Sequence, residues 1–299
     1  MSSAPGPQAA LPPAVKGLLL VAGATFFWSL SGVFVRWLPE VPPWTFNAWR
    51  GLGMALSMLA WMALHYRSRL GALLLATDPR SVLISGGCFA LGSTLYIVSL
   101  QMASVAAVSC IVATSGLFAA LLARAWLGER AGAMFYGAML LAIAGVVAIA
   151  FGESAASFSG LAGSLVAVLV AITFAAQSVS LRRYRALGME PALFAGGLAV
   201  FVLLSLVTGL APIPGWQLAM LLFMGAIQLA LPLVLFMRGA QHMPAAQMVL
   251  VSMLDAALNP LWVWLVFGEV PSEGVFAGGA LVLLAIAVNA WPQLRTAGR

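Results

Sequence analysis

The chain has 299 residues, of which 63% are hydrophobic and only 7% are charged. A soluble domain contains roughly 25% charged residues, so a chain of this composition cannot cover itself with a polar surface. The composition therefore excludes a soluble globular protein. In a membrane protein, the net charge of +6 indicates loop topology rather than nucleic-acid binding.

Uncharged apolar runs follow one another along most of the sequence, and the longest covers 191–237. A bilayer-spanning helix needs about 20 predominantly apolar residues, whereas the strands of a transmembrane barrel alternate apolar and polar residues. The sequence therefore predicts an all-α polytopic membrane protein. In chain order, the ten expected transmembrane helices cover about 17–37, 44–64, 80–101, 105–127, 132–151, 159–180, 190–209, 216–238, 245–267 and 272–291.

Basic residues lie mostly at one end of these expected helices. The cytoplasmic segments of membrane proteins are rich in Lys and Arg. If the N-terminus is cytoplasmic, twelve of the fourteen Lys and Arg residues fall in inner segments. We therefore expect a loose cytoplasmic N-terminal segment at 1–16 and a cytoplasmic tail at 292–299.

The two halves of the chain share a sparse pattern. Leu-Gly-Glu-Arg at 127–130 aligns with Phe-Gly-Glu-Val at 267–270 at an offset of 140 residues, and earlier in the chain the offset becomes 148. The common register predicts two five-helix repeats, at 17–151 and 157–291. Because five is odd, the second repeat must enter the membrane inverted, as in many secondary transporters that work by alternating access. Two ancestral halves in a protein that is not a transporter would leave the same pattern.

Ten helices in two halves, with Gly-Glu at 128–129 and 268–269 closing the fourth and ninth helices, resemble the EamA-type branch of the drug/metabolite transporter superfamily. The resemblance covers roughly 17–291 and is closest to the YddG-type amino-acid exporters. It implies a central cavity surrounded by helices 1–4 and 6–9, and efflux of small metabolites across the inner (plasma) membrane. The fourth helix lacks the proline that many members carry, so we expect the corresponding break only at Pro260.

The first and sixth helices each carry a stripe of small and polar residues. On the first helix these are Thr25, Trp28, Ser29, Gly32 and Arg36, and on the sixth they are Thr173, Gln177, Ser180 and Tyr184. Small residues let membrane helices approach closely, and polar residues hydrogen-bond between them. Gly32 and Ser180 fit this packing role. Trp28 and Gln177 are larger, and they either pack in the same way or line a cavity.

The third and eighth helices also carry polar residues at membrane depth. The third offers Tyr96 and Ser99 on one face, and the eighth offers Gln228. A glutamine buried in a transmembrane span must find hydrogen-bond partners. Pro232 leaves a carbonyl near Gln228 without its helical donor. This turn either binds a substrate ammonium or forms a kink that neighbouring helices satisfy.

Arg50 is the one basic residue well inside an expected span. It follows Trp44 by six residues, about 9 Å from the outer interface at a rise of 1.5 Å per residue, and Asn47 lies one turn above it. Three roles are open for Arg50. Its side chain extends to the interface, attracts a substrate carboxylate, or pairs with an acid in the cavity.

Asp255 is the one acidic residue well inside an expected span, about 15 Å deep. A charge at the centre of the bilayer costs at least ~2.5 kcal/mol on insertion scales. Helical spacing places Asp255 on one face with Ser252, Asn259 and Trp262. The carboxylate accepts a structural hydrogen bond, pairs with Arg50, binds a substrate ammonium or exchanges a proton, and the residues leave these alternatives open.

The expected function is a secondary transporter that exports amino acids, aromatic and other neutral ones, by alternating access. An amino acid carries both charges, which one cation and one anion in the cavity would match. Drug-like cations or other small metabolites are the alternative substrates. A membrane enzyme is disfavoured, because the sequence has no glycine-rich phosphate loop, no metal-ligand cluster and only two histidines. A channel would lack a binding step.

We therefore expect no catalytic residue, no metal and no cofactor. The expected partners are the amino-acid substrate and the lipid bilayer, without nucleic acid, and we expect the chain to act as a monomer. The candidate cavity residues are Trp28, Asn47, Arg50, Tyr96, Gln177, Gln228, Asp255, Asn259 and Trp262.

Overall fold

The computed structural model describes residues 12–102, 108, 111–153, 161–185, 188–268, 270 and 273–297. Within these residues, the regular structure is helical throughout, as the sequence predicts. Most of the expected N-terminal segment and the junction between the two halves lie outside the described residues.

The described helices follow the expected ranges, except that 105–107, 109 and 110 of the fourth expected helix lie outside the described residues. Several ranges are split into pieces. The first half contains α1 (Pro13–Trp28), α2 (Ser31–Trp37), α3 (Pro43–Tyr66), the 3₁₀ turn η1 (Arg67–Arg69), α4 (Leu70–Ala76), α5 (Pro79–Ser81), the π-helical turn η2 (Val82–Gly86), α6 (Gly87–Met102), α8 (Ser115–Leu127) and α9 (Ala133–Glu153). The second half contains α10 (Leu161–Arg183), α11 (Glu190–Thr208), α12 (Gly215–Met224), the π-helical turn η3 (Gly225–Ala230), α13 (Leu231–Gly239), α14 (Ala245–Ser252), α15 (Leu254–Phe267) and α16 (Glu273–Ala297). The last helix thus continues into the expected tail at 292–299.

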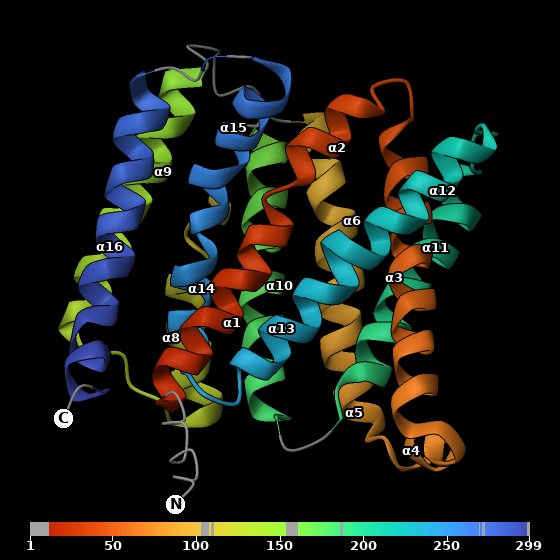
Figure 1. Cartoon of the computed structure of the whole chain (residues 1–299), viewed down its shortest axis with the longest axis horizontal. Coiled ribbons are helices and arrows are strands. Elements are labelled where there is room, and N and C mark those ends of the chain that lie inside the picture. The colour runs from red at the N-terminus through yellow and green to blue at the C-terminus, as the bar shows by residue number, and fades with distance from the viewer. Residues whose placement is uncertain are drawn as a thin grey trace, which may run out of the picture.

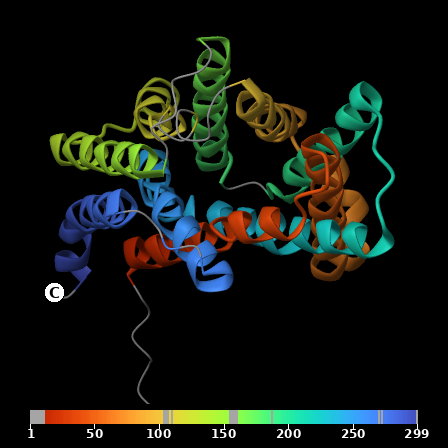
Figure 2. The same cartoon turned by 90° about the horizontal axis from the view of Figure 1, so that it is seen from above.

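Long helical passes run between two sides of the molecule (Figure 1). Seen from above, α9 and α16 lie at one edge, and α3, α11 and α12 lie at the opposite edge (Figure 2). Among the described residues, seven helices are long and apolar enough to cross a membrane, and shorter apolar helices cover 115–127 and 133–148. The protein is therefore an all-helical, multi-pass membrane protein.

One side of the molecule collects most of the described basic residues. α1 begins and α16 ends at this side, which is the lower side in Figure 1, and α3, α8, α10 and α13 also end there. We call it the basic side. The basic residues of these helix ends and of the segments beside them are Lys16, Arg67, Arg69, Arg80, Arg124, Arg130, Arg182, Arg183, Arg185 and Arg238.

Within the described residues, three of the expected helices are broken rather than continuous. The fourth expected helix is interrupted by turn residues at Ala113 and Thr114, immediately before α8. Ser29 and Leu30 separate α1 from α2, and Met253 separates α14 from α15. The expected break at Pro260 is wrong, because Pro260 lies inside α15. The chain tightens earlier instead, where the Met253 amide donates to the Leu250 carbonyl three residues back, at 3.2 Å.

The fourth and ninth expected helices end in the same way. Gly128 closes α8 with φ +70°, and Gly268 closes α15 with φ +73°. Both values are left-handed, a conformation that glycine adopts without the steric penalty of a Cβ atom. The two glycines are 140 residues apart, so the register seen in the sequence reappears in the backbone conformation.

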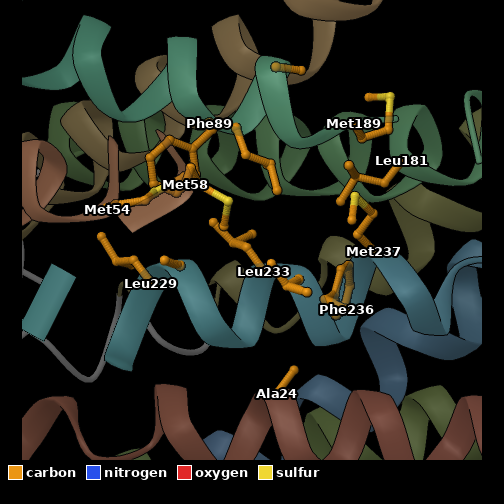
Figure 3. Packing of buried hydrophobic residues seen from close by; sticks show 14 of the residues in the cluster. Ala24, Met54, Met58, Phe89, Leu181, Met189, Leu229, Leu233, Phe236 and Met237 are labelled. Carbon is orange, nitrogen blue, oxygen red and sulfur yellow. The ribbon is translucent and has the colours of Figure 1, made fainter. Parts of the chain in front are cut away.

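The largest apolar core joins helices from both halves of the chain. Leu229 of η3 and Leu233 of α13 lie opposite Met54 and Met58 of α3, and Phe236 lies further along α13 in the same cluster (Figure 3). All five side chains are buried. Methionine is unbranched and flexible, so it fills irregular gaps between helices, and this core holds the two halves together.

Within this region, α3 and η3 touch backbone to backbone. A Cβ atom added to Gly225 would overlap the carbonyl oxygen of Arg50 and approach the amide nitrogen of Met54. One added to Gly53 would overlap the carbonyl oxygen of Leu222. Small residues permit such close approach in membranes, so these two glycines set the position of α3 against the eighth pass.

We expect Gly225→Ala to destabilise the protein. The added methyl group must push η3 away from α3, and overpacking of this kind costs about 1–3 kcal/mol. The measurement is thermal unfolding of the purified protein in detergent. Gly137→Ala is the matched control, because a Cβ atom there meets nothing within 4 Å and alanine favours helix. An equal effect of the two substitutions would contradict the contact.

Candidate functional site

Amide side chains hold the guanidinium of Arg50 inside the protein. Its Nη2 donates to Oδ1 of Asn47 at 3.0 Å, and its Nη1 donates to Oε1 of Gln228 at 3.3 Å. The Ser93 hydroxyl donates to the same Asn47 oxygen at 3.0 Å. Asn47 and Gln228 are buried, so they orient Arg50, and its side chain does not extend to the interface.

The positive charge of Arg50 is not neutralised by an acid. Among the described residues, its hydrogen-bond partners are the two amides, and no salt bridge to it is found. The Phe46 ring also lies below the guanidinium, with 5.6 Å between the ring centroid and Cζ. The Nε atom is buried without a partner, so the group keeps both its charge and an unused donor.

The π-helical turn η3 explains how Gln228 reaches Arg50. Gly225 begins η3 against the backbone of Arg50, and Gln228 follows three residues later. The wider π turn accommodates Pro232, and π turns often occur at functional sites. The other end of the Gln228 amide donates from Nε2 to the backbone carbonyl of Trp28 at 3.3 Å, where α1 ends.

The ring of Trp28 joins an aromatic cluster beside these amides. Its centroid lies 5.2 Å from that of Phe236 and 6.3 Å from that of Phe174. Phe236 belongs to the eighth pass and Phe174 to the sixth, so Trp28 packs against two other passes. Its side chain remains partly exposed, and it therefore combines the two roles that the sequence left open, packing and an accessible apolar surface.

Asp255 lies in the first turn of α15, not in the middle of a continuous helix as the sequence suggested. The partial positive charge of a helix N-terminus favours a carboxylate at this place. The break at Met253 also separates Ser252 from the expected polar face of α15. Ser115, the counterpart of Asp255 at the 140-residue offset, likewise begins its helix.

The carboxylate of Asp255 has no partner among the described residues. No hydrogen bond or ion pair to it is found there, and its Oδ1 is fully buried. A pair with Arg50 and a structural hydrogen bond are therefore both absent from this structure. Buried polar atoms are normally hydrogen-bonded, so this oxygen is available to a ligand or a proton.

Tyr96 of α6 interacts electrostatically with both charged residues. Its side chain lies within electrostatic range of both Arg50 and Asp255, and it is 36% exposed. Ser99, expected on the same face, is buried and donates to the Tyr96 carbonyl at 2.8 Å. The structure thus places Tyr96 of α6 within electrostatic range of Arg50 in α3 and of Asp255 in α15.

Asn259 and Trp262 contact the broken first pass instead. Nδ2 of Asn259 donates to the Ser31 hydroxyl at 3.0 Å, and Nε1 of Trp262 donates to the Ser29 hydroxyl at 2.8 Å. Gly32 packs directly against Asn259, leaving no room for a Cβ atom. These two candidates therefore join α15 to the region between α1 and α2.

Gln177 is buried in α10, and its Nε2 has no hydrogen-bond partner. Ser180, one turn later, meets the Ser85 hydroxyl at 2.5 Å, which agrees with the packing role expected for it. Ser93 and Thr94 of α6 were not selected from the sequence. Ser93 lies three residues before Tyr96, so helical spacing from Tyr96 was the signal that could have found it.

An ion pair joins both halves at the basic side. Nε of Arg182 lies 2.9 Å from Oε1 of Glu129, with the side chains 14% and 26% exposed. Arg182 also donates through Nη1 to the carbonyl of Ala240, just after α13. A glutamate after a helix C-terminus opposes the helix dipole, and the arginine offsets this. Glu269, the counterpart of Glu129, lies outside the described residues.

Two matches identify the family of this chain. A model of the EamA-like transporter family matches residues 15–151 and matches again at 158–291. The chain belongs to the EamA-like transporter family. It therefore contains two EamA repeats, and this family consists of secondary transporters of the drug/metabolite superfamily rather than enzymes.

Solved structures agree with this transporter in fold. One crystal structure superposes with a TM-score of 0.79 at 20% sequence identity, covering 94% of this chain and 99% of that chain. At that identity the likeness concerns the fold alone. No curated protein matches the sequence.

We expect Glu129→Gln and Arg182→Gln each to lower the thermal stability of this transporter. Each removes one side of a partly buried charged hydrogen bond, with a cost of about 1–3 kcal/mol. The double variant should cost less than the sum, because both changes break one interaction. Arg183→Gln is the control. The Arg183 side chain follows Arg182 in the sequence and is exposed, so its loss should not change the thermal stability. Additive effects in the unfolding midpoints would contradict a direct pair.

Proposed function

We propose that this EamA-like transporter exports amino acids, aromatic and other neutral ones, by alternating access. The observation that carries the proposal is an unneutralised Arg50 and an unpartnered Asp255, with Tyr96 within electrostatic range of both. A zwitterion is the ligand that matches one fixed cation and one fixed anion. Its carboxylate binds Arg50, and its ammonium binds Asp255.

The supporting residues suit a ligand of this kind. Asn47 and Gln228 hold the Arg50 guanidinium by their oxygens, so its Nε remains for a carboxylate. Gln177 offers a further unpartnered donor. The partly exposed rings of Trp28 and Tyr96 provide apolar surface that accepts varied side chains without fixing one shape.

The proposed architecture is ten transmembrane passes in two inverted five-helix repeats. The equivalent left-handed caps at Gly128 and Gly268 support it, as does the start of α1 on the same side as the end of α16 (Figure 1). The arginines of the basic side support a cytoplasmic location for that side. Alternating access would then expose the site between the repeats first to the cytoplasm and then outside the inner membrane.

The test is uptake of labelled Phe, Met, Thr and Lys into proteoliposomes, with and without a pH gradient. We expect saturable Phe uptake. Phenethylamine and 3-phenylpropionate each lack one charge of Phe and should compete less well than Phe itself. Uptake independent of the gradient would indicate facilitated diffusion. No uptake of any amino acid would overturn the substrate proposal, and uptake of phenethylamine alone would point to cations.

The two charges can be assigned separately. Arg50→Gln should raise the half-saturating Phe concentration about 10- to 100-fold, because a hydrogen bond to a charged group contributes about 1.5–3 kcal/mol, and it should leave competition by phenethylamine unchanged. Asp255→Asn should also raise the half-saturating Phe concentration. It should weaken competition by phenethylamine and leave competition by 3-phenylpropionate unchanged. Arg124→Gln, an exposed arginine of the basic side, is the control. Normal transport by folded Asp255→Asn would contradict the role of this carboxylate.

A further inference from the structure

A short helix lies across the end of α3 at the basic side. Arg67 has φ +43° and ψ −115°, and among the described residues it is the one non-glycine with positive φ. This conformation stops α3 and turns the chain through η1 into α4 (Figure 1). α4 displays leucines on its surface, since Leu74 is 43% and Leu75 is 90% exposed. Such a helix suits the membrane interface.

A groove of about 590 Å³ lies between α4 and the neighbouring passes. Its walls are mostly apolar, and they include Leu74, Thr77, Val82, Leu83, Phe194 and Ala195. The volume falls in the range of pockets that hold small-molecule ligands. The groove lies on the outside of the molecule, because Leu83 is 76% exposed, so it faces the lipid in a membrane.

Three exposed arginines of the basic side lie close in the sequence to residues of the groove walls. Arg67 and Arg69 immediately precede α4, and Arg80 immediately follows the groove residue Pro79. Asp78 is the nearby acid in the sequence, and its carboxylate accepts a hydrogen bond from the Arg80 amide at 3.1 Å. This leaves an excess of positive charge where the headgroups of a lipid layer would lie.

The acid on the opposite wall does not cancel this charge at the surface. Glu190 begins α11 next to the groove residue Pro191, and its side chain is buried. It accepts a hydrogen bond from the Tyr66 hydroxyl at 3.4 Å. The exposed charged residues next to the groove walls in the sequence are thus mainly arginines, whose planar guanidinium matches phosphate geometry.

We propose that this groove binds an anionic phospholipid, with an acyl chain between α4 and α11 and the phosphate beside Arg69 and Arg80. The apolar walls account for the chain, and the arginines account for a preference for a negative headgroup over a zwitterionic one. The bound lipid holds α4 against α11 and so links the second, third and seventh passes at the basic side. The proposal does not depend on which substrate is carried.

The experiment is a native mass spectrometry titration of the detergent-purified, full-length protein with dioleoylphosphatidylglycerol and with dioleoylphosphatidylcholine. We expect the phosphatidylglycerol to bind more tightly. A basic residue near a membrane surface contributes a factor of about five in affinity. The double variant R69Q/R80Q should therefore lose about 25-fold in affinity for phosphatidylglycerol and little for phosphatidylcholine. The double variant R124Q/R183Q, at two other exposed arginines of the basic side, is the control with the same loss of two charges.

The acyl chain is tested by filling the groove. Ala195→Trp should weaken binding of both lipids, whereas Leu91→Trp, a lipid-facing substitution outside the groove walls, should not. The unfolding midpoint of each variant is measured in parallel, so that loss of fold is recognised. Equal affinities for the two lipids, or no effect of R69Q/R80Q, would overturn the proposal. Competition by inorganic phosphate as strong as that by lipid would also overturn it, since it would indicate a phosphate site without a chain.

Discussion

The arrangement of this transporter depends on a charge that apolar helices must accommodate. Arg50 lies within a transmembrane helix and has no acid partner in the described part of the chain, so neutral amide oxygens must take the place of water around it. The Asn47 oxygen comes from α3 itself, whereas the Gln228 oxygen reaches Arg50 where Gly53 and Gly225 let α3 meet α12 and η3 backbone to backbone. The same contact brings Leu229 over Met54 in the core. The packing of α3 and the hydrogen bonding of Arg50 therefore both depend on the close backbone contact at the two glycines.

Breaks in the helices place polar backbone groups and charges at the same depth. The end of α1 releases the Trp28 carbonyl to Gln228, and the break at Met253 turns Asp255 into a first-turn residue of α15. A carboxylate at a helix N-terminus is stabilised by the helix dipole, whereas the same residue inside a continuous helix would not be. Discontinuous helices of this kind are how many transporters bind charged ligands in a membrane. The breaks thus act on the Trp28 carbonyl and on Asp255, whereas Arg50 lies in the continuous helix α3.

The basic side joins the halves by different means. Arg182 brings together the end of α8, the end of α10 and the carbonyl of Ala240, so one guanidinium connects residues from both repeats. On another part of this side, Arg67 redirects the chain into α4, which leaves an apolar groove bordered by arginines. Arginine therefore serves three distinct purposes in this chain: a charge held by amides, a partner for helix ends, and a border that favours negative headgroups.

The sequence by itself determined the helical, membrane-spanning class, because long uncharged runs have no other stable solution in lipid. It also determined the repeat register, since Gly128 and Gly268 take the same left-handed conformation, and it selected Arg50 and Asp255 as charges at depth. Only the tertiary structure decided the helix breaks, which fall at Ser29–Leu30, Ala113–Thr114 and Met253, where no proline or glycine marks them, and not at Pro260. It likewise decided that Arg50 binds Gln228, 178 residues away, instead of Asp255. Periodicity within one helix predicts which face a residue occupies. The hydrogen-bond partner that the residue meets on that face depends on how the helices pack.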